Sequence, residues 1–158
     1  MIAAAIHWLA PWLLAAQVAT YSAAVEREAA RQRVDPLLVV ALIYHESRFH
    51  AGAVSPGGSH GLMQVRVSRT HRARWLGRER ALRVPEVNVR VGVGILSMWR
   101  AYHRRRCLGS NDPEFPDRHP FWSHFQWGSR VRSAASGRRV GATYRALVRR
   151  FRKAGGVL

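Results

Sequence analysis

Apolar residues run with few interruptions through residues 2–25, where no charged side chain occurs. A membrane-spanning helix needs about 20 predominantly apolar residues, but Pro11 and several polar residues break this segment. We therefore interpret residues 1–24 as a leader or membrane-anchoring segment that ends in small residues suited to cleavage. The alternative is that Pro11 to Arg33 forms the first helix of the domain.

The next helix has a clear start signal at Val34-Asp35-Pro36. Aspartate favours the N-cap position and proline the first helical position, so a helix should begin at Pro36 and run to Arg48. Apolar residues cover nearly the whole circumference of its first two turns, which predicts an inner helix. Residues 51–61 are small and turn-forming and predict a loop. Gly61 to Val65 is short and apolar, as in an extended or hairpin-like piece.

Helical patterns return in the second half of the chain. One helix is expected from about Pro85 to His103, a second over residues 121–128, and a basic final helix over residues 140–153. Gly92 and Gly94 lie inside the first of these. A glycine costs about 1 kcal/mol relative to alanine in a helix interior, so both glycines suggest close packing against another backbone.

The 158 residues are enough for one domain of ordinary size, which we place at residues 25–158. With 47% hydrophobic residues the chain can bury a core. Cys107 is the single cysteine, so no intramolecular disulfide can form, and a cysteine-ligated zinc site is implausible. The fold class indicated by these patterns is mainly α.

The net charge of +17 raises nucleic-acid binding as a hypothesis, because arginine pairs well with phosphate. All of the basic residues except Lys153 are arginines. They are spread through every segment without a recognised binding motif, and the composition also fits a coding bias towards arginine. We expect no specific nucleic-acid partner and keep an arginine-rich nucleic-acid-binding protein as the weaker alternative.

Nine carboxylates are few enough to compare one by one. Asp35 resembles a helix cap, and seven others sit among polar neighbours and look solvated: Glu26, Glu28, Glu79, Glu86, Asp112, Glu114 and Asp117. Glu46 differs, because helical spacing puts it on the same face as Leu42 and Ile43. Burial and the nearby helix C-terminus would both raise the pKa of its carboxyl, and a neutral carboxylic acid suits general-acid cleavage of a glycosidic bond. The alternative is a structural ion pair with Arg48.

A zinc peptidase is a competing hypothesis, since His45, Glu46 and His50 lie close together in the sequence. The metal motif needs two histidines four residues apart on one helical face. Here the separation is five residues, which turns the second histidine by about 140° from the first. We therefore expect no metal site, and no cofactor.

The residues around Glu46 resemble a known signature. Glu46-Ser47-Arg48-Phe49, then Ser55, then Gly61-Leu62-Met63-Gln64 are similar to the first block of the lytic transglycosylases with a soluble-type (SLT), lysozyme-like catalytic domain. Three later features follow in the family's order: Asn88, Gly92 and Leu96 in one helix, Phe125-Gln126-Trp127-Gly128 in place of Tyr-Asn-x-Gly, and Tyr144.

The resemblance implies a lysozyme-like α+β domain, mainly helical, with a small loop or hairpin segment beside a substrate cleft. It also implies cleavage of the β-1,4 bond between N-acetylmuramic acid and N-acetylglucosamine (MurNAc–GlcNAc) in peptidoglycan. Glu46 would be the only catalytic carboxylate and would be assisted by the acetamido group of the substrate, giving 1,6-anhydro products. This agrees with the absence of any Asp or Glu between Glu46 and Glu79.

The same resemblance assigns substrate-binding roles to Ser55, Gly61, Met63, Gln64, Phe125, Gln126 and Tyr144. Met63 would line the cleft, Gly61 would allow close backbone approach, and Tyr144 would offer a hydroxyl near the acid. Met63 and Tyr144 could equally be core residues, and Ser55 before Pro56 could be a turn residue.

Phe125-Gln126 departs from the family's Tyr-Asn pair, so a degenerate, non-catalytic peptidoglycan binder is the main alternative function. The expected partner is the peptidoglycan glycan strand, with transient membrane association through the N-terminus. We expect a monomer that is exported to the periplasm or cell envelope, where this substrate lies.

Overall fold

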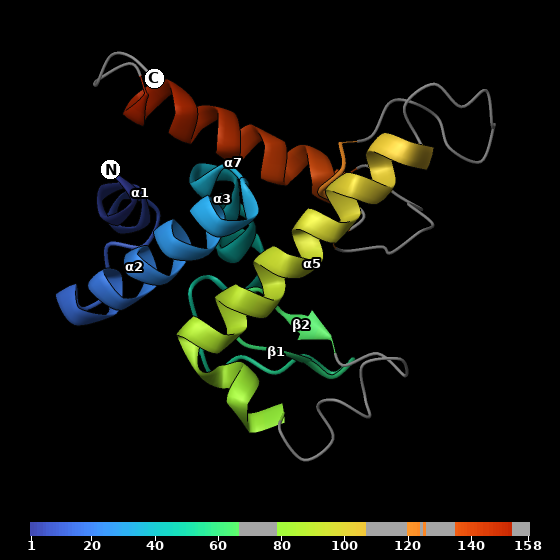
Figure 1. Ribbon diagram of the computed structural model, residues 1–158. Coiled ribbons are helices and arrows are strands. Elements are labelled where there is room, and N and C mark those ends of the chain that lie inside the picture. Colours follow the sequence, from blue (N-terminus) through green and yellow to red (C-terminus); the bar gives the residue numbers. More distant parts are fainter. Residues whose placement is uncertain (67–78, 107–119, 124, 126–134, 153–158) are drawn as a thin grey trace.

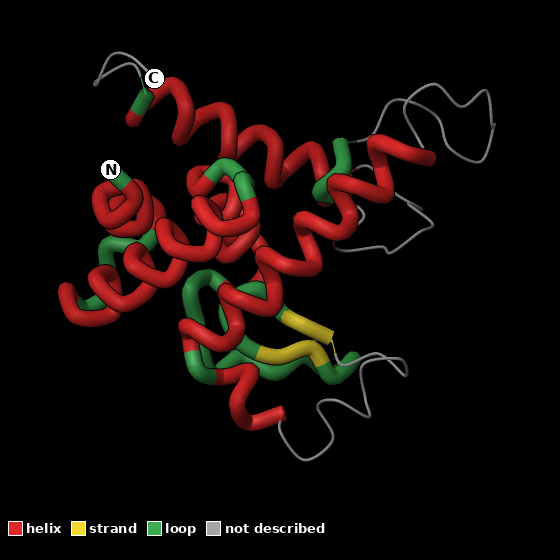
Figure 2. The backbone as a smooth tube through the Cα atoms, in the orientation of Figure 1, coloured by secondary structure: helices red, strands yellow, loops and turns green. Residues whose placement is uncertain are grey.

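The computed structural model describes residues 1–66, 79–106, 120–123, 125 and 135–152. Its elements in chain order are α1 (Ile2–Leu9), α2 (Ala15–Gln32), α3 (Pro36–Ser47), β1 (Ser59–His60), β2 (Val65–Arg66), the 3-10 helix η1 (Glu79–Arg83), α5 (Pro85–Arg106) and α7 (Ala135–Phe151). Helices dominate, and the two short strands pair antiparallel (Figure 2). The predicted mainly α class with a small hairpin is confirmed.

The inner position predicted for the helix that starts at Pro36 is confirmed. Every residue of α3 from Leu37 to Ile43 is buried, and α1, α2 and α7 all pack against this helix. The long helix α5 packs along α2 and runs across the molecule, with the hairpin beside the first half of α5 (Figure 1). The arrangement places the C-terminal end of α3 close to the chain that leads into the hairpin.

Residues 2–25 form α1 and the first half of α2. Ile2, Ala5 and Ile6 on α1 are fully buried in the same core as α3. The helix proposed as the alternative, from Pro11 to Arg33, corresponds to α2. No helix in the described part of the chain has the length and hydropathy needed to cross a bilayer. The assignment of residues 1–24 as a leader or anchor stays a prediction.

Gly92 is closely packed, but against a side chain where another backbone was expected, and the packing expected at Gly94 is not present. A methyl group added to Gly92 would lie 2.5 Å from Met63 Sδ, so the thioether occupies the space that the missing side chain leaves. The same group at Gly94 would meet no described atom within 4 Å. Of these two positions, only Gly92 has a neighbour that leaves no room for a side chain.

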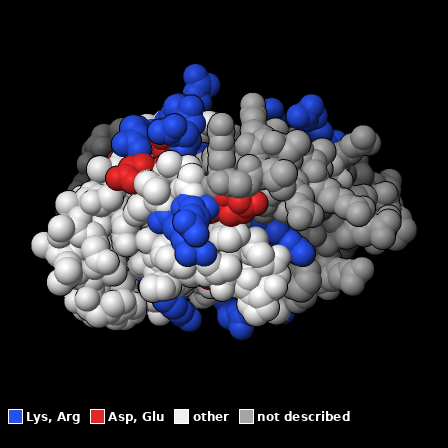
Figure 3. Space-filling model, turned by 90° about the horizontal axis from the view of Figure 1, so that it is seen from below, with Lys and Arg blue, Asp and Glu red and all other residues white. Residues whose placement is uncertain are grey.

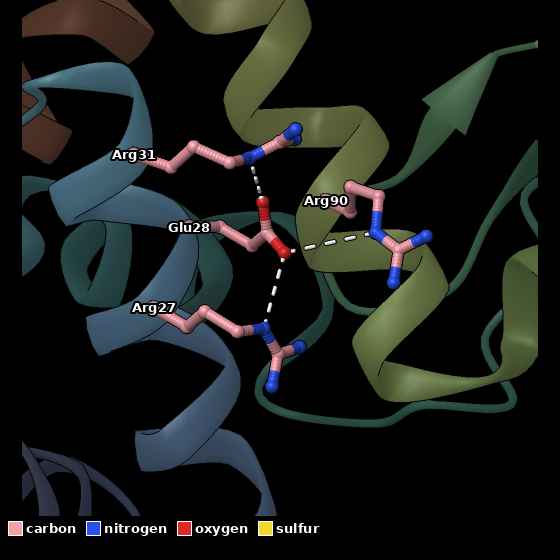
Figure 4. Close-up of polar contacts among 4 residues, drawn as sticks. All are labelled: Arg27, Glu28, Arg31 and Arg90. Atoms are coloured by element: carbon pink, nitrogen blue, oxygen red, sulfur yellow. Dashed lines mark hydrogen bonds and ion pairs between the residues drawn. The ribbon is translucent and has the colours of Figure 1, made fainter.

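Glu28 was expected in solvent, and this expectation is wrong. Its side chain on α2 is 3% exposed and faces α5, where three arginines reach it through their Nε atoms (Figure 4). The distances to its carboxylate oxygens are 3.2 Å from Arg27, 2.8 Å from Arg31 and 3.6 Å from Arg90. The ion pairs replace the lost hydration and join α2 to α5.

The surface charge is dispersed. On the face in Figure 3 the basic side chains lie in several separate groups, some with acidic side chains beside them. The described residues on this face therefore form no continuous basic stripe of the kind that nucleic-acid binding would favour.

Candidate active site

Glu46 lies in the last turn of α3 and is half-buried. The helix ends directly after it, because Arg48 and Phe49 both adopt left-handed backbone conformations, with φ of 52° and 63°. Phe49 is 2% exposed and stacks on Tyr21 of α2, with 6.5 Å between ring centroids. This buried ring fixes the turn, so the chain leaves α3 sharply and Glu46 stands at the edge of the helical core.

The neighbouring His45 connects this end of α3 to α7. Its Nε2 lies 2.9 Å from Thr143 Oγ1. Burial lowers the pKa of His45, and the positive charges of Arg48 and Arg139 lower it further. The neutral imidazole is therefore favoured, and the residue next to Glu46 is held by a hydrogen bond.

Ser55 lies in the tight loop before β1. Its Oγ accepts a hydrogen bond from the backbone N–H of Ser59 at 3.0 Å, and its own backbone N–H donates to Ser59 O at 2.9 Å. These contacts give Ser55 the turn role that was weighed as its alternative. A contact with the sugar stays a prediction for this residue.

The turn between β1 and β2 contains the Gly61-Leu62-Met63-Gln64 motif. Gly61 and Gln64 have φ of 73° and 46°, and the amide nitrogen of Gln64 donates to Gly61 O at 3.0 Å. The Gln64 side chain thus folds over its own turn and is half-buried. Its predicted contact with substrate remains to be tested.

Asn88 on α5 fixes this turn, a role that the sequence did not reveal. The side chain is fully buried. Its Oδ1 accepts from the Met63 backbone N–H at 2.7 Å, and its Nδ2 donates to His60 O at 2.8 Å and to Leu82 O at 2.6 Å. The sequence did contain a signal for this role, because Asn88 is an amide on an otherwise apolar helix face. A buried polar group there needs hydrogen-bond partners.

Gly61 lies close to other parts of the protein, and its approach to substrate stays a prediction. A methyl group there would lie 2.2 Å from Leu82 O and 2.3 Å from Asn88 Nδ2. Because Gly61 has no side chain, the turn can pack directly against Asn88. The left-handed φ of Gly61 also favours glycine at this position.

Met63 has the core position that was the alternative to lining the cleft, and its contact with substrate stays a prediction. It is fully buried and its sulfur packs over Gly92. An apolar side chain is stabilised by such dry packing, in agreement with the core position.

Tyr144 was expected near the acid, but its hydroxyl lies at the opposite end of α3. It donates to Asp35 Oδ2, the same carboxylate that caps α3 by accepting from the Leu37 N–H at 3.0 Å. Arg152 pairs with this oxygen as well. Asp35 and Glu46 are eleven positions apart in the sequence, about 16 Å along a helix axis. A role of Tyr144 in substrate binding stays a prediction.

The Phe125-Gln126 pair, which stands in place of Tyr-Asn, is described only in part. Phe125 is half-buried and packs against the core. Gln126 lies outside the described residues, so its predicted role is untested.

A mainly helical domain that presents a half-buried glutamate at the end of its inner helix, next to a short hairpin, has the architecture of a lysozyme-like domain. A comparison with known families matches residues 23–108 to the transglycosylase SLT domain. The match spans more than half of the chain, and the protein belongs to the transglycosylase SLT domain family. No curated protein matches the chain.

Proposed function

We propose that the protein is a peptidoglycan lytic transglycosylase with Glu46 as its single catalytic carboxylate. The observation that carries this proposal is the position of Glu46: half-buried in the last turn of α3, immediately before the loop and hairpin that hold the rest of the family's signature. A carboxyl group at such an edge can be shielded from bulk water and still reach a bound glycan strand.

The chemistry needs one proton donor that later becomes a proton acceptor. Protonated Glu46 donates its proton to the glycosidic oxygen as the bond to C1 of the MurNAc unit breaks. The carbonyl oxygen of the neighbouring acetamido group stabilises the positive charge at C1. The Glu46 carboxylate then removes the proton from the 6-hydroxyl of the same sugar, and that oxygen bonds to C1. The 1,6-anhydro ring forms and Glu46 is protonated again.

Two neighbours support Glu46 in this scheme. His45 holds α3 to α7, and the stacked Phe49 fixes the turn that follows. The glycan strand would lie over this edge and the hairpin, where the Ser55 hydroxyl and the Gln64 amide can reach sugar oxygens. We propose that the monomer acts in the periplasm or cell envelope after export, since peptidoglycan lies outside the cytoplasmic membrane.

The test is digestion of purified peptidoglycan followed by mass spectrometry of the fragments. The wild type should release 1,6-anhydro muropeptides, and Glu46→Gln should lower the rate by about 100-fold or more because an amide cannot donate the proton. Glu79→Gln is the matched control, since Glu79 is the next carboxylate along the chain, and it should keep its activity.

Other products would contradict the scheme in distinct ways. Fragments with reducing ends would make the protein a hydrolase. Binding to peptidoglycan without any fragments would identify the non-catalytic binder instead. Loss of activity in Glu79→Gln with unchanged folding would show that a second carboxylate takes part.

A further inference from the structure

Three arginines converge on the carboxylate of Glu28 where α2 meets α5 (Figure 4). The Glu28 side chain is 3% exposed, whereas the side chains of Arg27, Arg31 and Arg90 are 51%, 56% and 57% exposed. The carboxylate therefore lies beneath the guanidinium groups, and an ion that approaches from solvent meets the three positive charges first. All four residues follow residue 24, so the cluster does not depend on the segment interpreted as a leader.

The charges of this cluster do not balance. Three guanidinium groups against one carboxylate leave two positive charges in excess. Within the described residues, no carboxylate other than Glu28 pairs with any of the three arginines. Arg27 and Arg90 reach the same oxygen, Oε1, at 3.2 and 3.6 Å, so their like charges are held close together. An anion bound between these groups would offset their repulsion.

The hydrogen-bond donors of the cluster are also not used up. Each arginine contacts Glu28 through its Nε atom, so the terminal Nη1 and Nη2 atoms of all three side chains lie away from the carboxylate (Figure 4). The planar guanidinium presents its N–H groups in a fixed fork, which matches two oxygens of a phosphate. Because Glu28 already holds each Nε, less side-chain freedom is lost when an anion binds.

A second contact holds the two helices that carry the cluster. Arg100, further along α5, donates from Nη2 to Gln32 O at 3.0 Å and from Nη1 to Arg33 O at the end of α2. The spacing between Arg31 on α2 and Arg90 on α5 is therefore supported on both sides of the cluster. The site is organised before any ligand binds.

We propose that this arginine cluster binds a phosphate dianion, either free phosphate or the terminal group of a phosphomonoester. Such a group carries a charge of about −1.5 to −2 at pH 7 and so matches the two excess positive charges, whereas a carboxylate or a phosphodiester carries only one negative charge. Its oxygens accept hydrogen bonds from the Nη atoms of Arg27, Arg31 and Arg90 together. The inference rests on the cluster alone and does not depend on the reaction at Glu46.

The test is calorimetric titration of the protein at pH 8, with the ionic strength fixed by chloride. Inorganic phosphate and glycerol 3-phosphate are the two dianionic probes, and binding of only one of them would identify which form of phosphate the site accepts. Dimethyl phosphate, a monoanion, should bind at least about tenfold more weakly, as expected when a charge-assisted contact is lost.

The decisive variant combines Arg27→Gln with Arg90→Gln. It removes both excess charges and leaves the pair between Glu28 and Arg31, at 2.8 Å, to neutralise the buried carboxylate. Its affinity for phosphate should fall at least about tenfold. If this variant does not fold, Arg27→Lys with Arg90→Lys keeps the charges and removes the planar forks, and it should still bind phosphate several-fold more weakly than the wild type.

The matched control combines Arg145→Gln with Arg149→Gln on α7. Both side chains are exposed and form no ion pair with any described residue, so the control loses the same net charge at a distance from the cluster. It should keep the affinity of the wild type for phosphate. Thermal unfolding of every variant without ligand separates a lost contact from a lost fold.

Absence of phosphate binding in the wild type would overturn the proposal, and so would equal affinity in the wild type and the cluster variant. An equal loss in the α7 control would assign the binding to total charge. Dimethyl phosphate that binds as tightly as phosphate would make the ligand a phosphodiester, against the proposal. Failure of the proposed function would appear separately, as the absence of 1,6-anhydro products from peptidoglycan.

Discussion

The side chain of Asn88 bonds the backbone N–H of Met63 across 2.7 Å, although 25 residues separate them in the chain. The same amide donates to His60 O, just before the motif turn, and to Leu82 O of η1. The Met63 side chain packs over Gly92, one helical turn further along α5. Two separate parts of the family's signature therefore form one packed unit. Asn88 holds the turn by hydrogen bonds, and Gly92 makes room for the Met63 side chain.

This unit predicts opposite effects for two glycine substitutions in α5. Gly92→Ala places a methyl group against Met63 and should destabilise the protein by about 1–3 kcal/mol, as overpacking does. Gly94→Ala enters open space and should stabilise the protein by about 0.5–1 kcal/mol through helix propensity. Denaturant unfolding of both variants measures the two changes.

A double substitution tests the cause of the Gly92 effect. Met63→Ala removes the side chain that the new methyl group would meet, so Gly92→Ala should cost less in that background. Equal costs with and without Met63 would show that the strain has another origin.

Removal of the buried carboxylate of Glu28 should leave three arginines facing one another. Glu28→Gln keeps the volume of the side chain and should destabilise the protein by about 2–3 kcal/mol, below the range for fully buried pairs because the arginine side chains are half exposed. Arg31→Gln removes one exposed partner and should cost about 0.5–1 kcal/mol. Thermal unfolding at matched ionic strength distinguishes the two, and similar losses would contradict the central role of Glu28.

Acid should weaken the contact between α3 and α7. The pKa of His45 is lowered in the folded protein by burial and by Arg48 and Arg139, whereas the unfolded chain has the ordinary value of 6.5. The stability that neutral His45 contributes is therefore present above pH 6.5 and is lost as the pH falls through 6.5 towards the lower folded value. Denaturant unfolding at pH 7.5 and 5 should show a smaller loss in His45→Gln than in the wild type. An identical pH dependence in both proteins would assign the acid sensitivity to other histidines.

Tyr144→Phe should change stability and leave catalysis intact. The hydroxyl bonds Asp35 at the start of α3, so its removal should cost about 1 kcal/mol of unfolding free energy. The rate of release of 1,6-anhydro muropeptides should stay within about twofold of the wild type, since a contact absent from the reacting centre leaves the transition state unchanged. A large fall in the rate with unchanged stability would show that Tyr144 takes part in substrate binding or catalysis.

Local signals in the sequence were sufficient to predict where α3 and α5 begin. Asp35 and Pro36 define a helix start through contacts within a few residues, and the structure has the helix begin at Pro36 with the Asp35 side chain as its cap. The first block around Glu46 led to the family for a similar reason, because the motif is short and ordered.

Contacts between distant segments could not be predicted from the sequence. Met63 and Tyr144 have partners 25 and 109 residues away, and no local pattern indicates which face of a turn or helix will meet them. Glu28 looked solvated because its neighbours in the sequence are polar. Its burial depends on Arg90, which comes from α5.

The packing of α1 and α7 on α3 has a consequence for any shortened version of the protein. Both helices lie outside residues 23–108, yet they cover the apolar surface of α3, and α7 holds it at each end through Asp35 and His45. A fragment cut to the family boundaries would expose α3 to water and release the end that carries Glu46. The unit that folds is therefore larger than the unit that the family comparison recognises.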